Sequence, residues 1–512
     1  METVSLPQKT SLQPDQERPR QFGSKRLRVM RDPALLRAAD RCLGLFAALA
    51  ALWLWVASVD AQGYESGFPP LEISTSEIAL IGLSATGEYA ANWNAGTPLL
   101  IDLPAETTVQ LTAPVRAGSN YVFGGAFNKE YLLFHIGPDG SLMSGKTRRH
   151  PVSLEGLARV APVQLLRRAA DKEGGPSRYV LLSNGISNAT PPQPAPVLLS
   201  ELTTSDEPSA TFGEVGEVIL TPSDVSNDAT AILAHAMAQT SEGHLRVLVS
   251  SSVGSGNAAQ THFYVLGFEK DGSIDLDFDP RGLRRIELPL PKSASDVKVH
   301  FDEQQAEAGT VFVTFVEGIA YQRAISILKI DLRLGSLESE FEPAKLPVSS
   351  GLPVVKYAGL RDGRLVLFAD VTSAGKILVA ALDKSGKPSS GFGPTGVRVL
   401  LNHTAGANIQ SVVPGPGASL YILRSISTGN VSKLFLTRRD ASTAGAGARD
   451  PEFNGGQDLE IGTPTGTTSG GLTMRHFGTA ELNNATLIVR PNQPDTMLFF
   501  GTISSSRKSL QP

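Results

Sequence analysis

Three glycines in the stretch "SSGFGPTGVRVLL" match the fingerprint of a dinucleotide-binding loop. Gly391, Gly393 and Gly396 have the G-x-G-x-x-G spacing. In a Rossmann unit such glycines open a helix, and an acidic residue about twenty positions later binds the ribose. Here they lead into the β-type run "VRVLL", and no Asp or Glu occurs between Asp383 and Asp440. We therefore expect no nucleotide cofactor, and we expect the glycines to permit positive φ angles in a turn between strands.

Four carboxylates lie close together in the stretch "DGSIDLDFD", and oxygen-rich loops of this kind can bind Ca²⁺. They are Asp271, Asp275, Asp277 and Asp279. The corresponding turn "KSGKP" further along the chain has no such cluster. We therefore expect these side chains to accept hydrogen bonds from turn amides, and we assign no metal to them.

The remaining residues that could do chemistry show no spacing typical of a catalytic or metal site. No two of the eight histidines have the H-E-x-x-H spacing, and no G-x-S-x-G nucleophile elbow occurs. Cys42 is the only cysteine, so neither an internal disulfide nor a cysteine-ligated zinc is possible. The sequence thus assigns no catalytic residue, although a site assembled from distant parts of the chain stays open. The histidines are His135, His150, His235, His244, His262, His300, His403 and His476.

The first part of the chain has the pattern of a targeting segment. Residues 1–41 are rich in Lys and Arg, and the run from Cys42 to Val59 carries no charge. A basic flank before an apolar helix directs a chain to export with the positive end in the cytoplasm. We interpret 42–61 as a signal peptide core cleaved after Ala61, with a retained membrane anchor as the alternative. The net charge of −4 gives no attraction to nucleic acid.

Beyond Gln62 the chain repeats a unit of about sixty residues. Each unit has a β-type run, a polar turn, a short stretch with an aromatic residue and glycine, and a second β-type run. Examples are "FYVLGFEKDGSIDLDFDPRGLRRIEL" and "ILVAALDKSGKPSSGFGPTGVRVLL". The aromatic residue stands at Trp93, Phe212, Phe278, Phe341, Phe392 and Phe453.

Two further strand-like runs precede each of these units, as in "AILAHAM" and "LRVLVSS". Four strands per unit and seven units predict an all-β fold, a seven-bladed β-propeller of four-stranded antiparallel blades. The first unit lacks its first two strands, whereas "TLIVRPN" and "MLFFGTI" follow the last one. We therefore expect the N- and C-terminal strands to share one blade and close the ring. The predicted domains are a linker at 62–77, the propeller at 78–503 and a tail at 504–512.

The unit that begins at Phe263 resembles the repeat of the bacterial delta-60 repeat family. It has a strand, an Asp-Gly-Ser turn, an Asp two residues later, a Phe, and then a spaced Gly before a β run. The resemblance covers residues 71–503 and is weakest in the first, second and seventh units. It implies an exported propeller whose role is largely unassigned, and it supplies no catalytic residues.

The loops between second and third strands share a face with those joining blades, and the longest insertions lie there. Long loops on a rigid scaffold often carry binding. We name Asn188, Asn257, Gln260 and His403 as candidate contacts on this loop face.

The function expected is a non-enzymatic exported scaffold, monomeric and without cofactor, that binds a protein or glycan partner. One alternative is an exported lyase, lactonase or hydrolase with its site at the central channel. Another is a cell-envelope component anchored by residues 42–59.

The targeting segment gives the first testable prediction. When the full-length gene is expressed and the cells are fractionated, we expect a product that begins at Gln62 in the periplasm or medium, because Val59 and Ala61 offer the small residues of a cleavage site. Mass spectrometry of the N-terminus measures this directly. An intact Met1 terminus in the membrane fraction would contradict cleavage and support the anchored alternative.

Overall fold

The computed structural model has the predicted antiparallel strand pattern. It describes most of residues 72–508, with gaps that include 85–98, 104–109, 169–177, 188–193, 254–259, 287–293, 302–308 and 462–480. Residues 1–71 and 509–512 lie outside the described part, as do the predicted cleavage site at Ala61 and the motif residue Trp93.

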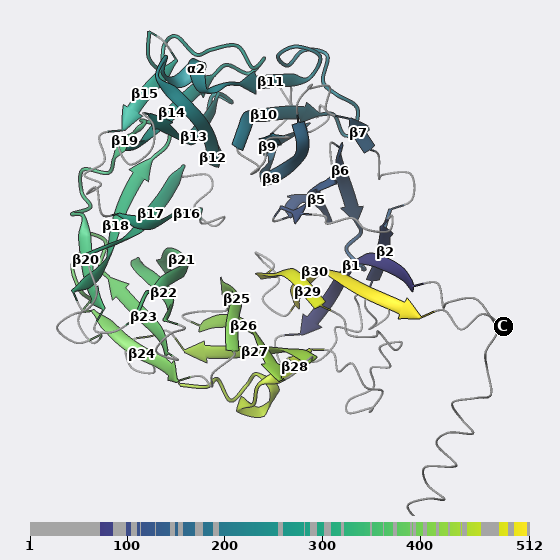
Figure 1. The fold of residues 1–512 in the computed structure, drawn as a ribbon, viewed down its shortest axis with the longest axis vertical. Helices are drawn as coiled ribbons and strands as arrows, with labels where there is room; N and C mark the ends of the chain where they lie inside the picture. The colour runs from purple at the N-terminus through teal and green to yellow at the C-terminus, as the bar shows by residue number, and fades with distance from the viewer. Residues whose placement is uncertain are drawn as a thin grey trace, which may run out of the picture. The chain divides into compact units, whose positions relative to one another are not determined.

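Six sheets of the described part are built from strands that are consecutive along the chain, and every pairing in them is antiparallel. Together they are blades of a β-propeller, named below by their strands (Figure 1). The strands are β3 (Gln110–Leu111), β4 (Val115–Ala117), β5 (Asn120–Phe127), β6 (Glu130–Ile136) and β7 (Arg149–Pro151); β8 (Leu157–Arg168), β9 (Arg178–Ser187), β10 (Pro194–Leu202) and β11 (Glu217–Leu220); β12 (Ala229–Gln239), β13 (Leu245–Val253), β14 (Gln260–Phe268) and β15 (Leu283–Ile286); β16 (Ser295–Phe301), β17 (Thr310–Glu317), β18 (Arg323–Asp331), β19 (Ser336–Leu337) and β20 (Ala344–Val348); β21 (Val354–Arg361), β22 (Arg364–Val371), β23 (Lys376–Leu382) and β24 (Val397–Asn402); β25 (Ala407–Pro414), β26 (Ser419–Thr428), β27 (Val431–Asp440) and β28 (Leu459–Ile461).

The four-stranded antiparallel blade is thus confirmed, and the described residues show six such blades where the sequence predicts seven. Two sheets have a fifth segment because one strand position is interrupted. Both β3 and β4 pair with β5, and both β19 and β20 pair with β18. A one-turn helix, α2 (Pro222–Val225), and a 3₁₀ turn, η5 (Asn454–Gly456), lie outside the sheets.

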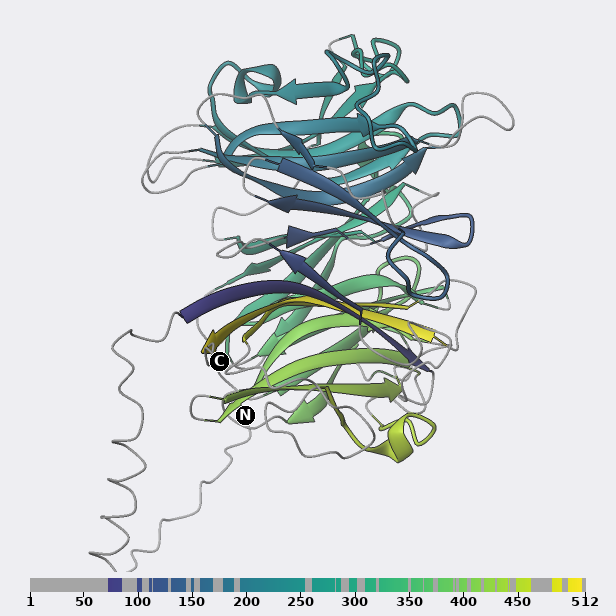
Figure 2. The ribbon, with the colours of Figure 1, turned by 90° about the vertical axis from the view of Figure 1, so that its right-hand side faces the viewer.

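A further sheet combines strands from the two ends of the chain. Its order is β2 (Leu99–Leu103), β1 (Glu72–Ser84), β30 (Thr496–Lys508) and β29 (Glu481–Val489). β1 pairs with β30 from Glu72 to Ser84, which is its whole length. Figure 2 shows the purple β1 lying alongside the yellow β30. These strands extend beyond the predicted propeller limits of 78 and 503.

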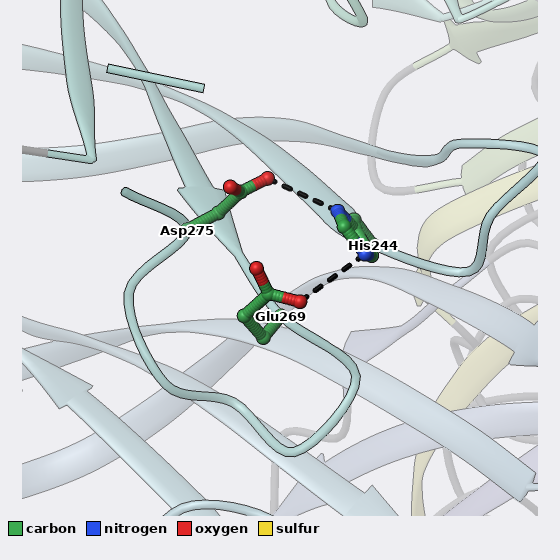
Figure 3. A group of neighbouring side chains, drawn as sticks. All are labelled: His244, Glu269 and Asp275. Carbon is green, nitrogen blue, oxygen red and sulfur yellow. Dashed lines mark hydrogen bonds and ion pairs between the residues drawn. The ribbon is translucent and has the colours of Figure 1, made fainter. Parts of the chain in front are cut away.

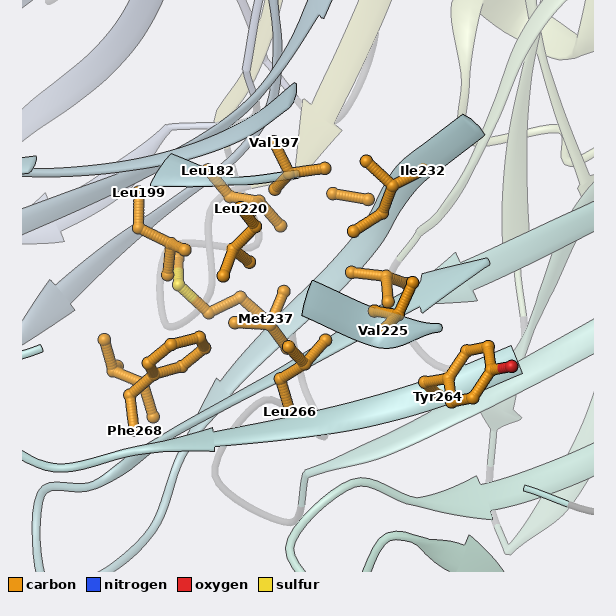
Figure 4. Close-up of a cluster of buried hydrophobic side chains, with 14 of the residues drawn as sticks. Leu182, Val197, Leu199, Leu220, Val225, Ile232, Met237, Tyr264, Leu266 and Phe268 are labelled. Atoms are coloured by element: carbon orange, nitrogen blue, oxygen red, sulfur yellow. The ribbon is translucent and has the colours of Figure 1, made fainter. Parts of the chain in front are cut away.

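Each pair of consecutive blades buries one apolar cluster between facing sheets. Val247 and Val249 of β13 face the β8–β11 blade, whereas Leu248 between them faces the β16–β20 blade. Because successive side chains of a strand point to opposite faces, a blade buried on both faces needs an uninterrupted apolar run. This explains why "LRVLV" does not alternate with polar residues. Figure 4 shows the cluster between the β8–β11 and β12–β15 blades, with Leu182 and Val197 on one side and Ile232 and Met237 on the other.

The repeated aromatic residue is buried wherever the structure describes it. Phe212, Phe278, Phe341, Phe392 and Phe453 are between 0% and 6% exposed. In four of the five, the phenylalanine amide donates to the carbonyl three residues earlier, as from Phe392 to Ser389 at 3.1 Å. The motif is therefore a folded turn that directs its aromatic ring into the seam between blades.

Gly396, the last glycine of the dinucleotide-like fingerprint, closes this turn. Its φ is +68°, and its carbonyl accepts a bond from the Ala381 amide at 3.1 Å. Gly216 and Gly282 have the same role, with φ of +87° and +63° and carbonyls bonded to Glu201 and Gly267. The prediction of a repeat turn is confirmed for Gly396. Gly391 and Gly393 lie outside the described residues.

The polar turn of one blade docks onto the aromatic turn of the preceding blade. The Gly213 amide, directly after Phe212, donates to the Asp271 carbonyl of the next blade at 2.6 Å. The Glu342 amide, directly after Phe341, donates in the same way to Ser385 at 2.9 Å. The glycine after each acceptor residue, Gly272 or Gly386, therefore lies against the neighbouring blade. A Cβ on Gly272, at φ +82°, would lie 2.8 Å from Val218 and 3.0 Å from the Gly213 amide nitrogen.

This docking predicts a difference between two glycine substitutions. Both Gly272→Ala and Gly118→Ala place alanine at a positive φ, but a Cβ on Gly118 has no atom within 4 Å. We expect Gly118→Ala to cost about 1 kcal/mol of unfolding free energy, the cost of the dihedral alone. Gly272→Ala should cost about 2 kcal/mol more, because the neighbouring blade must move. Equal losses in urea denaturation would contradict the docking contact.

Candidate functional site

The loop face predicted to bind a partner is only partly described. Gln260 lies at the exposed start of β14, opposite Val253. Asn188, Asn257 and His403 lie outside the described residues. Gln260 is therefore the one candidate of the four whose position is described, and the loop-face site stays a prediction.

Two of the four carboxylates of "DGSIDLDFD", Asp271 and Asp275, cap the turn as predicted. Asp271 accepts bonds from the amide and hydroxyl of Ser273 at 2.9 and 2.6 Å, and these bonds lower its pKa. The Oδ1 atom of Asp275 accepts the amides of Asp277 and Phe278, each at 3.0 Å. Burial opposes the charge of Asp275, but the Phe278 amide and the Arg246 guanidinium keep its pKa below the usual value.

Asp275 belongs to a cluster with His244 and Glu269 that the sequence did not predict. His244 lies in the turn between β12 and β13, and the two acids follow β14. The Nδ1 of His244 is 3.1 Å from Asp275 Oδ2, and its Nε2 is 3.1 Å from Glu269 Oε2. Figure 3 shows the imidazole between the two carboxylates. The three side chains form one group of possible metal ligands.

This geometry favours a hydrogen-bonded clamp over a metal centre. The two acids face different nitrogens of the imidazole ring, and one ion can bind only one of these nitrogens. The Arg246 Nη2 atom also lies 2.7 Å from Asp275 Oδ2 and supplies a positive charge there. With two backbone amides on Oδ1 and two cationic or ring donors on Oδ2, the carboxylate is saturated. The cluster therefore ties the two turns of its blade together.

A second buried network joins two blades. Arg168 and Glu201 are 3% and 0% exposed and form an ion pair, and Arg178 adds a contact of 2.9 Å to Glu201. Arg168 also donates to the Lys270 carbonyl of the β12–β15 blade at 2.9 Å. A buried ion pair is tolerated when both partners have further hydrogen bonds. At the preceding seam, His135 Nε2 lies 2.8 Å from Asp206 Oδ1.

The first strands of the blades carry the other notable polar groups. These first strands contact one another in succession: β8, β12, β16, β21 and β25. In Figure 1 they lie on the inner side of their blades. Each has a β-bulge in its pairing with the second strand. A first strand is an edge strand, so its inward backbone groups need partners from elsewhere. Bulges also re-aim a side chain and often lie next to functional sites.

Amide side chains of one blade bond the backbone on both sides of the next blade's bulge. Gln164 exchanges two hydrogen bonds with the backbone of Met237, at 2.7 and 2.9 Å. Asn184 does the same with Ala234, at 2.7 and 3.1 Å. His235, the bulge residue between them, bonds the Ser250 hydroxyl at 2.7 Å, and burial lowers its pKa to about 4.

The bulges of β16 and β21 bring together two lysines. Lys298 Nζ lies 3.3 Å from Asp296 Oδ1 and donates to the Val355 carbonyl at 3.2 Å. Lys356, directly after Val355, is half-buried, and the structure gives it no hydrogen-bond or ion-pair partner among the described residues. Burial and then the charge of Lys298 lower its pKa, whereas Asp370 and Asp296 act against this.

We call Asp296, Lys298, His300 and Lys356 the inner-strand site. His300 bonds the Thr314 hydroxyl at 2.9 Å, and burial and Lys298 lower its pKa to about 3, so the ring is neutral near pH 7. Asp296 has a φ of +50°, which is a strained value for a residue other than glycine. No sequence signal indicates this site, because a bulge shifts the strand register without a marked sequence pattern.

No model of a protein family matches the chain, and no curated protein matches it. Solved structures with a similar fold include prolyl oligopeptidase B from Galerina marginata, at 9% identity and a TM-score of 0.42. The match covers 76% of this chain and 46% of that one, so the chain spans about half of the oligopeptidase's length.

Two other similar structures have comparable scores. A post-proline cleaving enzyme from Rickettsia typhi is 10% identical with a TM-score of 0.38, over 78% of this chain and 53% of that one. The phage phi92 endosialidase is 9% identical with a TM-score of 0.35, over 82% and 72%. None of these likenesses assigns a function.

The described residues contain no helix with the length and hydropathy of a membrane span.

The buried network predicts unequal effects for two arginine substitutions. Arg168→Met leaves the fully buried Glu201 with one cation fewer and removes the bond to the neighbouring blade, so we expect a loss of about 3–5 kcal/mol of unfolding free energy. Arg333→Met removes a pair between an arginine side chain that is 46% exposed and Asp331. We expect this control to cost less than about 1 kcal/mol. Similar losses in chemical denaturation would contradict a seam role for Arg168.

Proposed function

We propose that the chain is a non-enzymatic exported β-propeller that acts as a binding scaffold for a protein or glycan partner. The observation that supports this is the use of its charged side chains. In the clusters described above, acids and bases bind one another within a blade or across a seam, as in Arg168–Glu201, His135–Asp206 and His244–Asp275.

General acid–base catalysis requires a group that can exchange a proton with the substrate. Asp275 has four donors on its two oxygens, and Glu201 is fully buried between two arginines. These groups stabilise the positions of blades and turns. A scaffold of this kind supports binding by its loop face and by the inner-strand site.

We also propose that the sheet of β2, β1, β30 and β29 serves as a seventh blade and closes the ring. The pairing of β1 with β30 supports this, as does the contact between β25 and β29. Closure removes two open blade edges, which would otherwise pair with other chains. Such a ring suits an exported scaffold that must stay folded without disulfides.

Binding and turnover of glycans distinguish a scaffold from an enzyme. We expect the purified full chain to bind a subset of immobilised glycans saturably on a glycan array. The bound glycans should be recovered chemically unchanged after prolonged incubation, because the acids of the Arg168–Glu201, His135–Asp206 and His244–Asp275 pairs are engaged in structural contacts. Mass spectrometry of the recovered glycans measures this. Product that accumulates in proportion to protein concentration would contradict a non-enzymatic role.

A further inference from the structure

The two lysines of the inner-strand site are held next to each other by backbone structure. β16 and β21 are adjacent first strands, and Lys298 donates to the carbonyl of the residue before Lys356. The bulge of β21 lies between Val355 and Tyr357, so it is Lys356 itself that is re-aimed. The β16 bulge lies between Ser295 and Lys298 and includes the strained Asp296.

The charges of the site are unevenly compensated. Lys298 has Asp296 at 3.3 Å, whereas Lys356 has no partner among the described residues. A half-buried ammonium without a partner loses hydration and gains no hydrogen bond in return. A ligand atom that accepts a hydrogen bond from Lys356 would compensate for the lost hydration. The backbone and Asp296 use two of the donors of Lys298, and one more is left for the same ligand.

Two acids near the lysines restrict the negative charge that the ligand can carry, and one of them offers it a hydrogen-bond acceptor. Asp296 and Asp370 both act on Lys356, so a dianion such as phosphate would meet repulsion that a single carboxylate largely escapes. The Oδ1 atom of Asp296 pairs with Lys298, whereas its Oδ2 atom is buried and has no hydrogen-bond partner among the described residues, so a hydroxyl group of a ligand could satisfy it. The combination of an ammonium without a partner and a carboxylate with one unsatisfied oxygen matches a molecule that carries one carboxylate and neighbouring hydroxyls.

We propose that the inner-strand site binds a sugar acid, with its carboxylate on Lys356 and Lys298 and a hydroxyl on Asp296. The ligand is either a free sugar acid or a uronic-acid residue of a glycan. This inference rests on the proposed function and specifies the ligand class of the scaffold.

Titration calorimetry with matched probes tests the proposal. The probes for the full chain are D-glucuronate, D-glucose without the carboxylate, acetate without the hydroxyls, and inorganic phosphate. We expect D-glucuronate to bind at least about tenfold more tightly than each of the others, because each lacks one recognised group or carries excess charge. A glucuronate-containing oligosaccharide that binds more tightly than the monosaccharide identifies a glycan source, and equal or weaker binding identifies the free acid.

Two lysine variants complete the test. Lys356→Met keeps the length of the side chain without its charge and should weaken D-glucuronate binding about tenfold or more. Lys345→Met is the control, because that side chain is 67% exposed and already pairs with Glu317 at 2.6 Å. Its affinity should stay within about twofold of the wild type. Thermal melts of both variants establish that each is folded.

Three results would overturn the inference. They are no binding of D-glucuronate, equal binding of D-glucose, and unchanged affinity in a folded Lys356→Met variant. Glycan binding that survives this substitution overturns the sugar-acid site and leaves the scaffold function standing. Conversion of D-glucuronate or its oligosaccharide to a product overturns the scaffold function even where Lys356 is required.

Discussion

The docking of each polar turn onto the aromatic turn of the preceding blade is the interaction on which the rest of the structure depends. A four-stranded blade has two apolar faces and cannot bury either by itself. The phenylalanine of the motif fills the seam, and the amide that follows it bonds the next blade's turn. Because Gly272 lies against this turn, the "DGS" sequence is explained by contact with a neighbour as well as by its own turn geometry.

The same constraint accounts for the polar groups inside the seams. Backbone groups at the edge of a first strand have no partner in their own sheet, so the side chains of Gln164 and Asn184 reach across from the preceding blade. Arg168 and His135 bridge blades at the turns. Asp206 has a φ of +62°, a value that favours glycine, and its side chain pairs with His135 of the preceding blade. Lys356 differs from these residues, since no described residue is its partner.

Much of the fold could be predicted from the sequence because the repeated unit carries a local signal. The buried phenylalanines, the turn glycine Gly396 and the four-strand order all follow from short patterns. The site could not be predicted in this way. His244 lies far along the chain from Asp275, and their contact depends on how two turns meet at one end of a blade.

The inner-strand site could not be predicted from the sequence for a different reason. A bulge changes which face a residue points to, and no residue type specifies it, so "PVVKYAG" reads as an ordinary strand. The loop-face candidates were chosen from composition, and only Gln260 among them falls on described residues. Chemistry in a propeller therefore has to be sought where blades meet as well as in the loops.

The pairing of β1 with β30 joins strands from the two ends of the chain, and the protection of β1 depends on it. Amide hydrogen exchange over Glu72–Ser84 can be compared between the full chain and a chain that ends at Gln493, before β30. We expect slow exchange of these amides in the full chain, similar to that of β13, and fast exchange in the shortened one. Equal exchange of this segment in both chains would contradict the pairing that joins the two ends.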